Sequence, residues 1–192
     1  MVTNLEINTK LKNYMKSKFR TFLYAILIGC SFIGVKAQVI DESLQLKASV
    51  AFNEIEIPEP NRFDPLGLNA KIVWSENKEQ CAIILKVELL TDWHIYASVT
   101  SASPFIPTEI ELELPEKGVI SISEWELPES EYYNEDCMVF VGEELHFIKY
   151  FKVEKGTVLN GNIKCGLYYQ ACDPYKCIQP QTKMVSIKIN NK

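Results

Sequence analysis

The chain has 192 residues, of which 47% are hydrophobic and 23% are charged, and its formal net charge is −5. Residues 1–37, a predicted export signal, contain six of the 20 Lys and Arg and one of the 25 Asp and Glu, so the remaining 155 residues carry a net charge of −10. That acidic balance argues against nucleic acid or an anionic membrane surface as a partner, and the remaining length suits one domain.

The N-terminus has the pattern of a secretory signal peptide. A basic stretch (residues 15–20) precedes an apolar run (22–35) that is too short to span a bilayer comfortably, and small residues up to Ala37 offer a cleavage site. Residues 1–14 are then an upstream extension. Two alternatives stay open: a lipobox that would acylate Cys30, and a transmembrane anchor. The sequence therefore predicts a protein exported to the periplasm.

Residues 38–64 show no regular pattern and are predicted to form an N-terminal arm or linker. From residue 66 onward, apolar and polar residues alternate with a period of two, and Gly and Pro turns recur at short intervals. The pattern predicts an all-β, immunoglobulin-like antiparallel sandwich of about eight strands over residues 65–192. A thioredoxin fold is excluded because no crossover helices are predicted. The predicted strands are 70–75, 81–88, 93–98, 109–114, 119–125, 138–140, 145–153, 159–169 and 182–189.

Five cysteines remain after removal of the signal, and this odd number leaves at least one without an intramolecular partner. Cys81 and Cys165 lie in apolar alternation, which predicts that they are buried, either bonded to each other or as small apolar side chains. The two histidines, His94 and His146, are predicted to be structural, and the glutamates of 109–113 to form a solvated strand face.

Cys172 and Cys177 lie five positions apart, and three interpretations compete for them. As a structural bridge the pair is poorly placed, because a short loop removes little entropy from the unfolded chain. As a metal site it would need Cys165 and His94, at a spacing unlike that of zinc knuckles.

A redox pair fits the sequence between the two cysteines best. Asp173-Pro174 favours a turn that brings the sulfurs together, and an exposed, locally closed bridge is the kind that exchanges. Lys176 beside Cys177 favours its thiolate, so Cys177 is predicted to be the attacking sulfur.

The segments Tyr-Gln-Ala-Cys (169–172) and Cys-Ile-Gln-Pro (177–180) resemble the active-site segment of the N-terminal periplasmic domain of DsbD, a thiol:disulfide interchange protein. The aromatic strand at 93–98 and the loop at 104–107 fit the same resemblance. It implies an immunoglobulin-like sandwich, present here as a stand-alone secreted domain.

The same resemblance implies an electron relay without a cofactor. The domain would take electrons from a thioredoxin-like or DsbD-type membrane thiol reductase and pass them to exported disulfide-containing proteins. The residues that it implies are the redox pair Cys172 and Cys177 and the neighbours Tyr96, Tyr169, Gln170, Asp173 and Lys176.

A cap loop over the cysteines is also implied, with Tyr132 or Tyr133 as the shielding aromatic and Glu135 and Asp136 beside it. This chain departs from the family pattern in lacking a glycine after the aromatic and in having Cys137 there. Two other functions stay open: a non-catalytic immunoglobulin-like binding module with a structural disulfide, and a periplasmic metal-binding protein.

Overall fold

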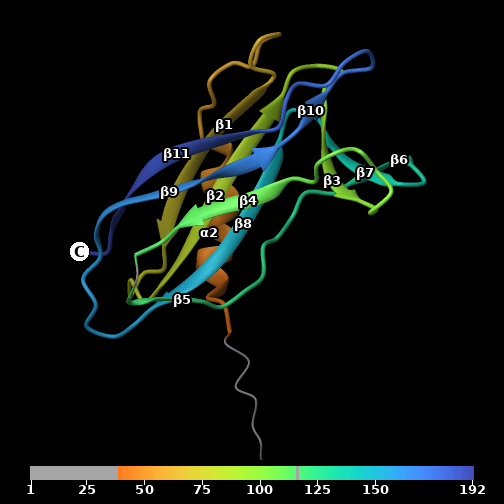
Figure 1. Ribbon diagram of the computed structural model, residues 1–192. Helices are drawn as coiled ribbons and strands as arrows, with labels where there is room; N and C mark the ends of the chain where they lie inside the picture. Colours follow the sequence, from red (N-terminus) through yellow and green to blue (C-terminus); the bar gives the residue numbers. More distant parts are fainter. Residues whose placement is uncertain (1–38, 116) are drawn as a thin grey trace, which may run out of the picture. The chain divides into compact units, whose positions relative to one another are not determined.

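The computed structural model describes residues 39–115 and 117–192; the predicted signal peptide and the alternative anchor at Cys30 lie outside these residues. The described part of the chain has one helix and eleven strands (Figure 1), and no helix in it is long and apolar enough to cross a membrane. The elements are α2 (Glu42–Asn53), β1 (Leu66–Trp74), β2 (Gln80–Leu89), β3 (His94–Val99), β4 (Glu109–Glu113), β5 (Val119–Ser121), β6 (Glu131–Asn134), β7 (Cys137–Val141), β8 (Leu145–Val153), β9 (Asn160–Tyr169), β10 (Ala171–Cys172) and β11 (Gln181–Asn190).

The strands form three sheets in which all neighbouring strands are antiparallel. Their orders are β1-β2-β8-β5, β11-β9-β4 and β10-β3-β7-β6. Side chains from all three sheets meet in one main core, which confirms the predicted immunoglobulin-like sandwich. The fully buried members of this core include Leu66, Ile83, Leu85, Ile95, Phe147, Phe151, Cys165, Leu167 and Tyr169.

Strand β2 shows how the alternation builds the core. Cys81, Ile83 and Leu85 point into the main core, whereas Ala82 and Ile84 point to the opposite face of the same sheet and are also buried. A strand buried on both faces needs a second layer over its outer face. That layer is helix α2, which packs across β1 and β2 (Figure 1).

The helix lies in the segment that the sequence predicts to be an arm or linker, so the prediction that this segment lacks regular structure is wrong. Leu44, Ala48 and Ala51 recur at helical spacing and are buried against the sheet. Asp41 caps the helix: its carboxylate accepts hydrogen bonds from the backbone N–H groups of Ser43 (2.8 Å) and Leu44 (3.3 Å). Three small or apolar residues make a stripe too narrow to detect in the sequence.

Eight of the eleven strands in the described residues have five or more residues, and the other three (β5, β6 and β10) are shorter. Neither β6 nor β10 was predicted as a strand. The strand predicted over 119–125 ends at Ser121. The Ile122 N–H still donates to the Tyr150 carbonyl, but the Tyr150 N–H donates to the Ser123 hydroxyl instead of a backbone carbonyl, so the backbone pairing stops there. The exposed glutamates of β4 confirm the predicted solvated face.

Candidate active site

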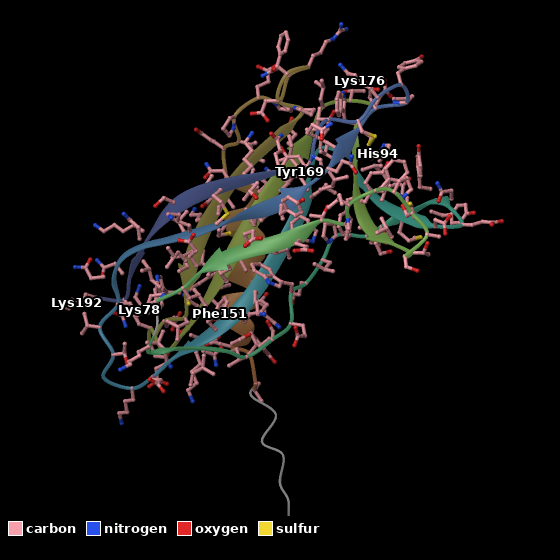
Figure 2. All side chains as sticks on the ribbon, in the orientation of Figure 1. Lys78, His94, Phe151, Tyr169, Lys176 and Lys192 are labelled. Carbon is pink, nitrogen blue, oxygen red and sulfur yellow. A yellow bond between two sulfur atoms is a disulfide. The ribbon has the colours of Figure 1, made fainter. Side chains whose placement is uncertain are left out.

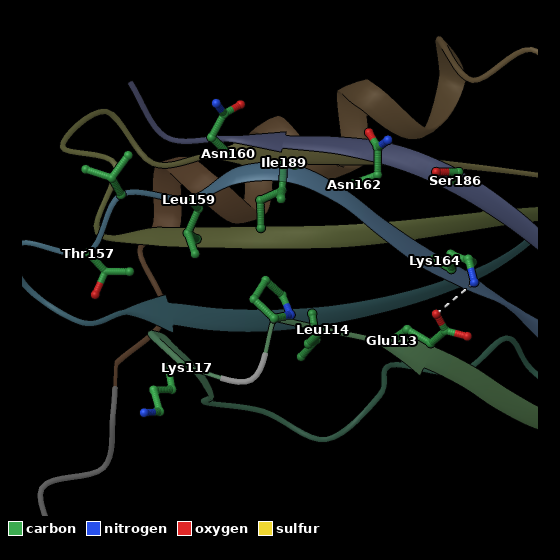
Figure 3. Close-up of a pocket in the computed structure, with 13 residues that line it drawn as sticks. Glu113, Leu114, Lys117, Thr157, Leu159, Asn160, Asn162, Lys164, Ser186 and Ile189 are labelled. Atoms are coloured by element: carbon green, nitrogen blue, oxygen red, sulfur yellow. Dashed lines mark ion pairs between the residues drawn. The ribbon is translucent and has the colours of Figure 1, made fainter.

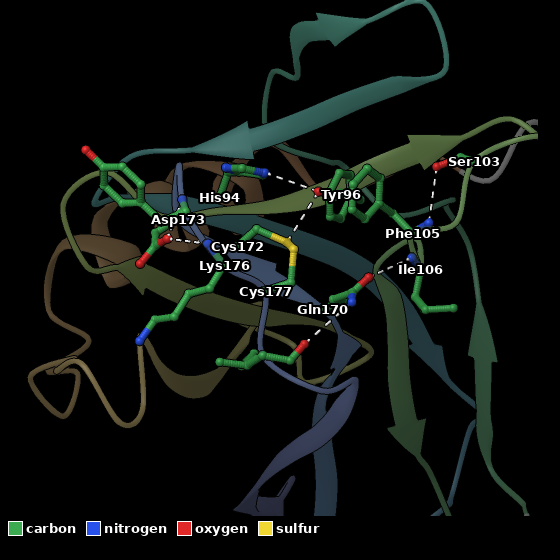
Figure 4. The surroundings of a disulfide bond; sticks show 12 residues. His94, Tyr96, Ser103, Phe105, Ile106, Gln170, Cys172, Asp173, Lys176 and Cys177 are labelled. Carbon is green, nitrogen blue, oxygen red and sulfur yellow. Dashed lines mark hydrogen bonds between the residues drawn. A yellow bond between two sulfur atoms is a disulfide. The ribbon is translucent and has the colours of Figure 1, made fainter.

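Cys172 and Cys177 form a disulfide where β10 and β3 meet (Figure 4), at the end of the domain where His94 and Lys176 are labelled in Figure 2. Their Cα atoms are 4.0 Å apart, which confirms the predicted bridging distance. The two cysteines differ in exposure: Cys172 is 2% exposed, whereas Cys177 is exposed to solvent. Cys177 is therefore the cysteine of the pair that a large reaction partner can reach.

Hydrogen bonds close the turn between the two cysteines independently of the sulfur atoms. The backbone N–H of Asp173 donates to the carbonyl of Lys176 (2.9 Å), and that of Ile178 donates to the carbonyl of Ala171 (2.9 Å). The Asp173 carboxylate accepts from the N–H groups of Tyr175 and Lys176, both at 2.8 Å, and these bonds lower its pKa. Four hydrogen bonds thus hold the turn in addition to the S–S bond.

Strand register places one face of β3 beside the disulfide. Cys172 lies directly opposite His94, and Ala171 lies opposite Ile95. Because side chains alternate along a strand, Ile95 and Ala171 point into the main core, while His94 and Tyr96 share the face of Cys172.

Tyr96 is fully buried, and its hydroxyl donates a hydrogen bond to the Sγ of Cys172 over 3.3 Å (Figure 4). The Nε2 atom of His94 lies 3.5 Å from the same hydroxyl. Burial raises the pKa of Tyr96, so the hydroxyl keeps its proton and remains a donor. Burial lowers the pKa of His94, and the Asp173 carboxylate partly opposes this shift.

Two aromatic rings cover the Tyr96 and His94 side chains. The ring of Phe105 stacks on Tyr96 with centroids 4.4 Å apart, and the ring of Tyr133 lies 4.8 Å from that of His94 and 6.2 Å from that of Tyr96. Tyr133 is thus the member of the predicted cap loop that lies against the residues next to Cys172.

The other predicted cap residues lie around a cavity of about 210 Å³ that Tyr132, Glu135 and Asp136 line together. Asp136 fastens the hairpin between β6 and β7 to the end of β3. Its carboxylate accepts from the hydroxyl of Thr100 (2.6 Å), and its carbonyl accepts from the Thr100 N–H (2.9 Å).

Gln170 joins two loops beside the disulfide. Its Oε1 accepts from the backbone N–H of Ile106 (3.1 Å), and its Nε2 donates to the carbonyl of Ile178 (3.5 Å). Lys176 extends its ammonium group over the ring of Trp93, with Nζ 5.8 Å from the centroid. Both side chains attach the disulfide turn to the strand and loop next to it.

Tyr169 belongs to the main core, where it is fully buried. Its hydroxyl accepts a hydrogen bond from Nε2 of Gln181 (2.8 Å), and burial raises its pKa to about 12. It holds the end of strand β9 in the core, directly before Gln170 and Cys172.

The remaining cysteines of the described chain are free and buried. Cys81 and Cys165 are not bonded to each other; they are apolar members of the main core, and burial raises the pKa of each thiol to about 12. Cys137 lies in a separate small cluster with Tyr96 and Cys172, and its Sγ is 3.3 Å from the hydroxyl of Ser103.

The four residues considered for a metal site are not brought together. Cys172 and Cys177 are bonded to each other, whereas Cys165 lies in the main core. Over residues 39–115 and 117–192, no three His, Cys, Asp or Glu side chains gather in a way that could hold a metal ion.

Two cavities are lined by different parts of the domain. One of about 330 Å³ is lined by Asp92, Trp93, His94, Val141 and Glu143 among others. The other, of about 590 Å³, lies where β9 begins and contains an ion pair between Glu113 and Lys164 with a 3.0 Å separation (Figure 3). The first is the one that shares residues with the candidate site.

His94 and Phe105 lie at this site but were not predicted as functional residues. His94 could have been found, because it is two positions from Tyr96 on a predicted strand and so shares its face. Phe105 had no comparable signal, since it lies in a loop between two prolines and its stacking on Tyr96 depends on the tertiary fold.

No family model matches the chain, and no curated protein matches its sequence. Several solved structures match its fold. The N-terminal periplasmic domain of ScsB from Proteus mirabilis matches with 18% identity over 70% of this chain and 50% of that chain, at a TM-score of 0.46. The DsbD N-terminal domain of Neisseria meningitidis in the reduced form matches with 14% identity over 64% and 86%, at a TM-score of 0.34.

The GAE domain of GGA2p from Saccharomyces cerevisiae also matches, with 8% identity over 71% of this chain and 98% of that chain and a TM-score of 0.38. The chain spans half the length of the ScsB structure that it matches. The DsbD and ScsB N-terminal periplasmic domains are thus among the solved structures to which this chain is similar.

Proposed function

We propose that the domain carries out thiol–disulfide exchange through Cys172 and Cys177. The observation that carries this proposal is the asymmetry of the bridge: an exposed Cys177 is bonded to a buried Cys172 in a turn that hydrogen bonds keep closed. Exchange requires a sulfur that a partner thiolate can reach. The exposure of Cys177 supports this, and the hydrogen bonds of the turn hold Cys172 next to it.

In the reducing step, a partner thiolate attacks Sγ of Cys177. The S–S bond breaks, its electron pair goes to Sγ of Cys172, and a mixed disulfide joins the partner to Cys177. A second partner thiol, once deprotonated, attacks the partner's own sulfur in that mixed disulfide and releases the Cys177 thiolate. Two electrons have then entered the domain, and the reverse sequence passes them to an oxidised protein.

The partners in this proposal are a thioredoxin-like or DsbD-type membrane thiol reductase as donor and exported disulfide-containing proteins as acceptors. The resemblance of residues 169–180 to the DsbD active-site segment supports this choice. The predicted signal peptide supports a periplasmic location, where disulfides persist.

A purely structural bridge is the competing function, and the energetics favour it less. Closing a loop with a sequence separation of five removes about 2 kcal/mol of chain entropy from the unfolded state. The turn also has four hydrogen bonds of its own, so the bridge adds little to its order.

Trapping of mixed disulfides tests the proposal. Cys172→Ser leaves the exposed Cys177, so it should accumulate a mixed disulfide with a reductase partner on non-reducing gels from periplasmic extracts. Cys177→Ser leaves the buried Cys172 and should trap far less, and Cys137→Ser is the matched control that keeps the bridge. If neither mutant traps a partner and both melt far below the parent, the bridge is structural and the domain is a binding module.

A further inference from the structure

The exchange reaction leaves a negative charge on a buried atom. When Cys177 is attacked, Cys172 is the leaving group, and its Sγ takes the electron pair in an environment with 2% exposure. Burial disfavours a thiolate unless a donor faces it. In the described residues, the group that donates a hydrogen bond to this sulfur is the Tyr96 hydroxyl.

We propose that Tyr96 and His94 form a donor chain that stabilises Cys172 as a thiolate, and this inference rests on the proposed exchange function. Nε2–H of His94 donates to the Tyr96 oxygen, and the Tyr96 hydroxyl donates to Sγ of Cys172. Tyr96 touches the reacting atom, whereas His94 is a positioning residue that acts through it (Figure 4).

The direction of the two hydrogen bonds in this donor chain follows from the number of protons that each group can donate. A tyrosine hydroxyl has one proton, so it cannot donate to His94 and to Cys172 at the same time. If Nε2 of His94 carries the proton, the two contacts are satisfied together and the hydroxyl is directed at the sulfur. The neutral imidazole is sufficient for this, in agreement with its lowered pKa.

No proton transfer is needed in the bond-breaking step. The partner thiolate forms the new S–S bond to Cys177, the old bond breaks, and Cys172 leaves as a thiolate that accepts the hydrogen bond already present. In the reverse direction the same bond holds Cys172 as a thiolate, ready to attack Cys177 in the mixed disulfide and expel the partner. The hydrogen bonds therefore make Cys172 a better leaving group in one direction, and in the other they keep more of it in the thiolate form that attacks.

The surroundings give His94 and Tyr96 little freedom to rotate away. Tyr96 is stacked on Phe105, and His94 is covered by Tyr133. The ionisable and polar groups that lie near His94 come from several elements, and they are Tyr96, Cys172, Asp173, Tyr133 and, across the neighbouring cavity, Asp92 and Glu143.

The test measures the acid dissociation of the Cys172 thiol directly. In full-length Cys177→Ser protein, thiolate absorbance near 240 nm is titrated with and without a second substitution, in difference against the Cys172→Ser/Cys177→Ser protein. Tyr96→Phe keeps the ring stacking but removes the donor, and it should lower the dissociation constant of Cys172 about ten- to hundredfold. The rate at which dithiothreitol reduces the intact disulfide should fall in Tyr96→Phe by about tenfold or more.

Two substitutions of His94 separate the donor chain from packing. His94→Phe fills the space without a donor and should lower the Cys172 dissociation constant, whereas His94→Gln presents an amide N–H near the Nε2 position and should restore most of it. His146→Gln, on an exposed histidine, should change nothing.

An unchanged Cys172 dissociation constant in Tyr96→Phe, or equal effects of His94→Phe and His94→Gln, would overturn the inference. These readings need no protein partner, so they are independent of mixed-disulfide trapping. If Cys172→Ser traps a partner but Tyr96→Phe leaves the Cys172 dissociation constant unchanged, the exchange function stands and the donor chain is wrong. If Tyr96→Phe lowers that constant but no partner is trapped, the exchange function is wrong.

Discussion

Exposure separates the two sulfurs of the bridge more clearly than charge does. Lys176 is adjacent to Cys177, but its ammonium group lies over Trp93, 5.8 Å from the ring centroid. Cys172 is covered from one side by Tyr96, whose hydroxyl contacts it. At this scale the site consists of one cysteine that a partner can reach and one that is buried, with the Tyr96 hydroxyl as its hydrogen-bond donor.

His94 should give the stability of the domain a pH dependence near neutrality. Its pKa is lowered in the folded state, so below the ordinary value of about 6.5 the unfolded chain binds the proton more readily. The free energy of unfolding should therefore fall as the pH decreases through 6.5 towards the folded pKa. Urea unfolding at pH 7.5 and 5.5 measures this difference.

His94→Gln should reduce the difference, whereas His146→Gln should retain it. Equal differences in the two variants would show that the groups around His94 do not hold it in the neutral form. The groups concerned are Asp173, Tyr133, Tyr96, Cys172, Asp92 and Glu143.

Asp173 should determine how ordered the turn remains once the disulfide is reduced. Asp173→Ala removes the acceptor for the Tyr175 and Lys176 amides, so hydrogen exchange at both amides should accelerate in the reduced protein. Asp173→Asn keeps a side-chain carbonyl acceptor and should exchange more slowly than the alanine variant. Equal protection in the alanine and asparagine variants would mean that the backbone bonds alone hold the turn.

Among the elements, helix α2 has a clear structural task. It covers the outer face of β2, where Ala82 and Ile84 are buried, and its own buried face is formed by Leu44, Ala48 and Ala51. Without it, this face of the sheet would be exposed to water, at a cost of about 25 cal/mol per Å² of apolar surface.

Two leucines that are two positions apart on α2, on opposite faces of the helix, test that task. Leu44 is fully buried, so Leu44→Ala should lower the free energy of unfolding by about 2–5 kcal/mol. Leu46 is 68% exposed, and Leu46→Ala should have an effect within about 0.5 kcal/mol. Chemical denaturation of both variants measures the contrast. Equal, small effects would mean that the helix contributes little to stability.

The sandwich could be predicted because each long strand carries its own period-two pattern. Helix α2 could not, because its buried stripe is short and two of its three members are alanines. A clue was present in β2, whose residues 81–85 are apolar on both faces and so require cover on both. That His94 and Tyr96 share a face could have been predicted from strand alternation, although it was not. The positions of Phe105 and Tyr133 depend on how distant loops fold onto β3.

Across the whole domain, the fold keeps two of its other thiols, Cys81 and Cys165, away from the exchange chemistry. Cys81 and Cys165 lie in the main core, and with a pKa of about 12 only about one in ten thousand of each is ionised at pH 8. Native protein treated with iodoacetamide should therefore leave both unmodified, whereas unfolded protein should be modified at both. Peptide mapping reads this out, and rapid native modification of either thiol would contradict the burial.

The reduction potential of the Cys172–Cys177 pair tests the central claim most directly. It is measured by equilibrating the protein with glutathione redox buffers and quantifying the oxidised fraction. An exchanging pair, with one exposed sulfur and a donor chain for the other, should have a potential near about −200 mV. A potential below about −300 mV would mark a bridge that resists reduction, and would contradict the proposal that this domain exchanges disulfides.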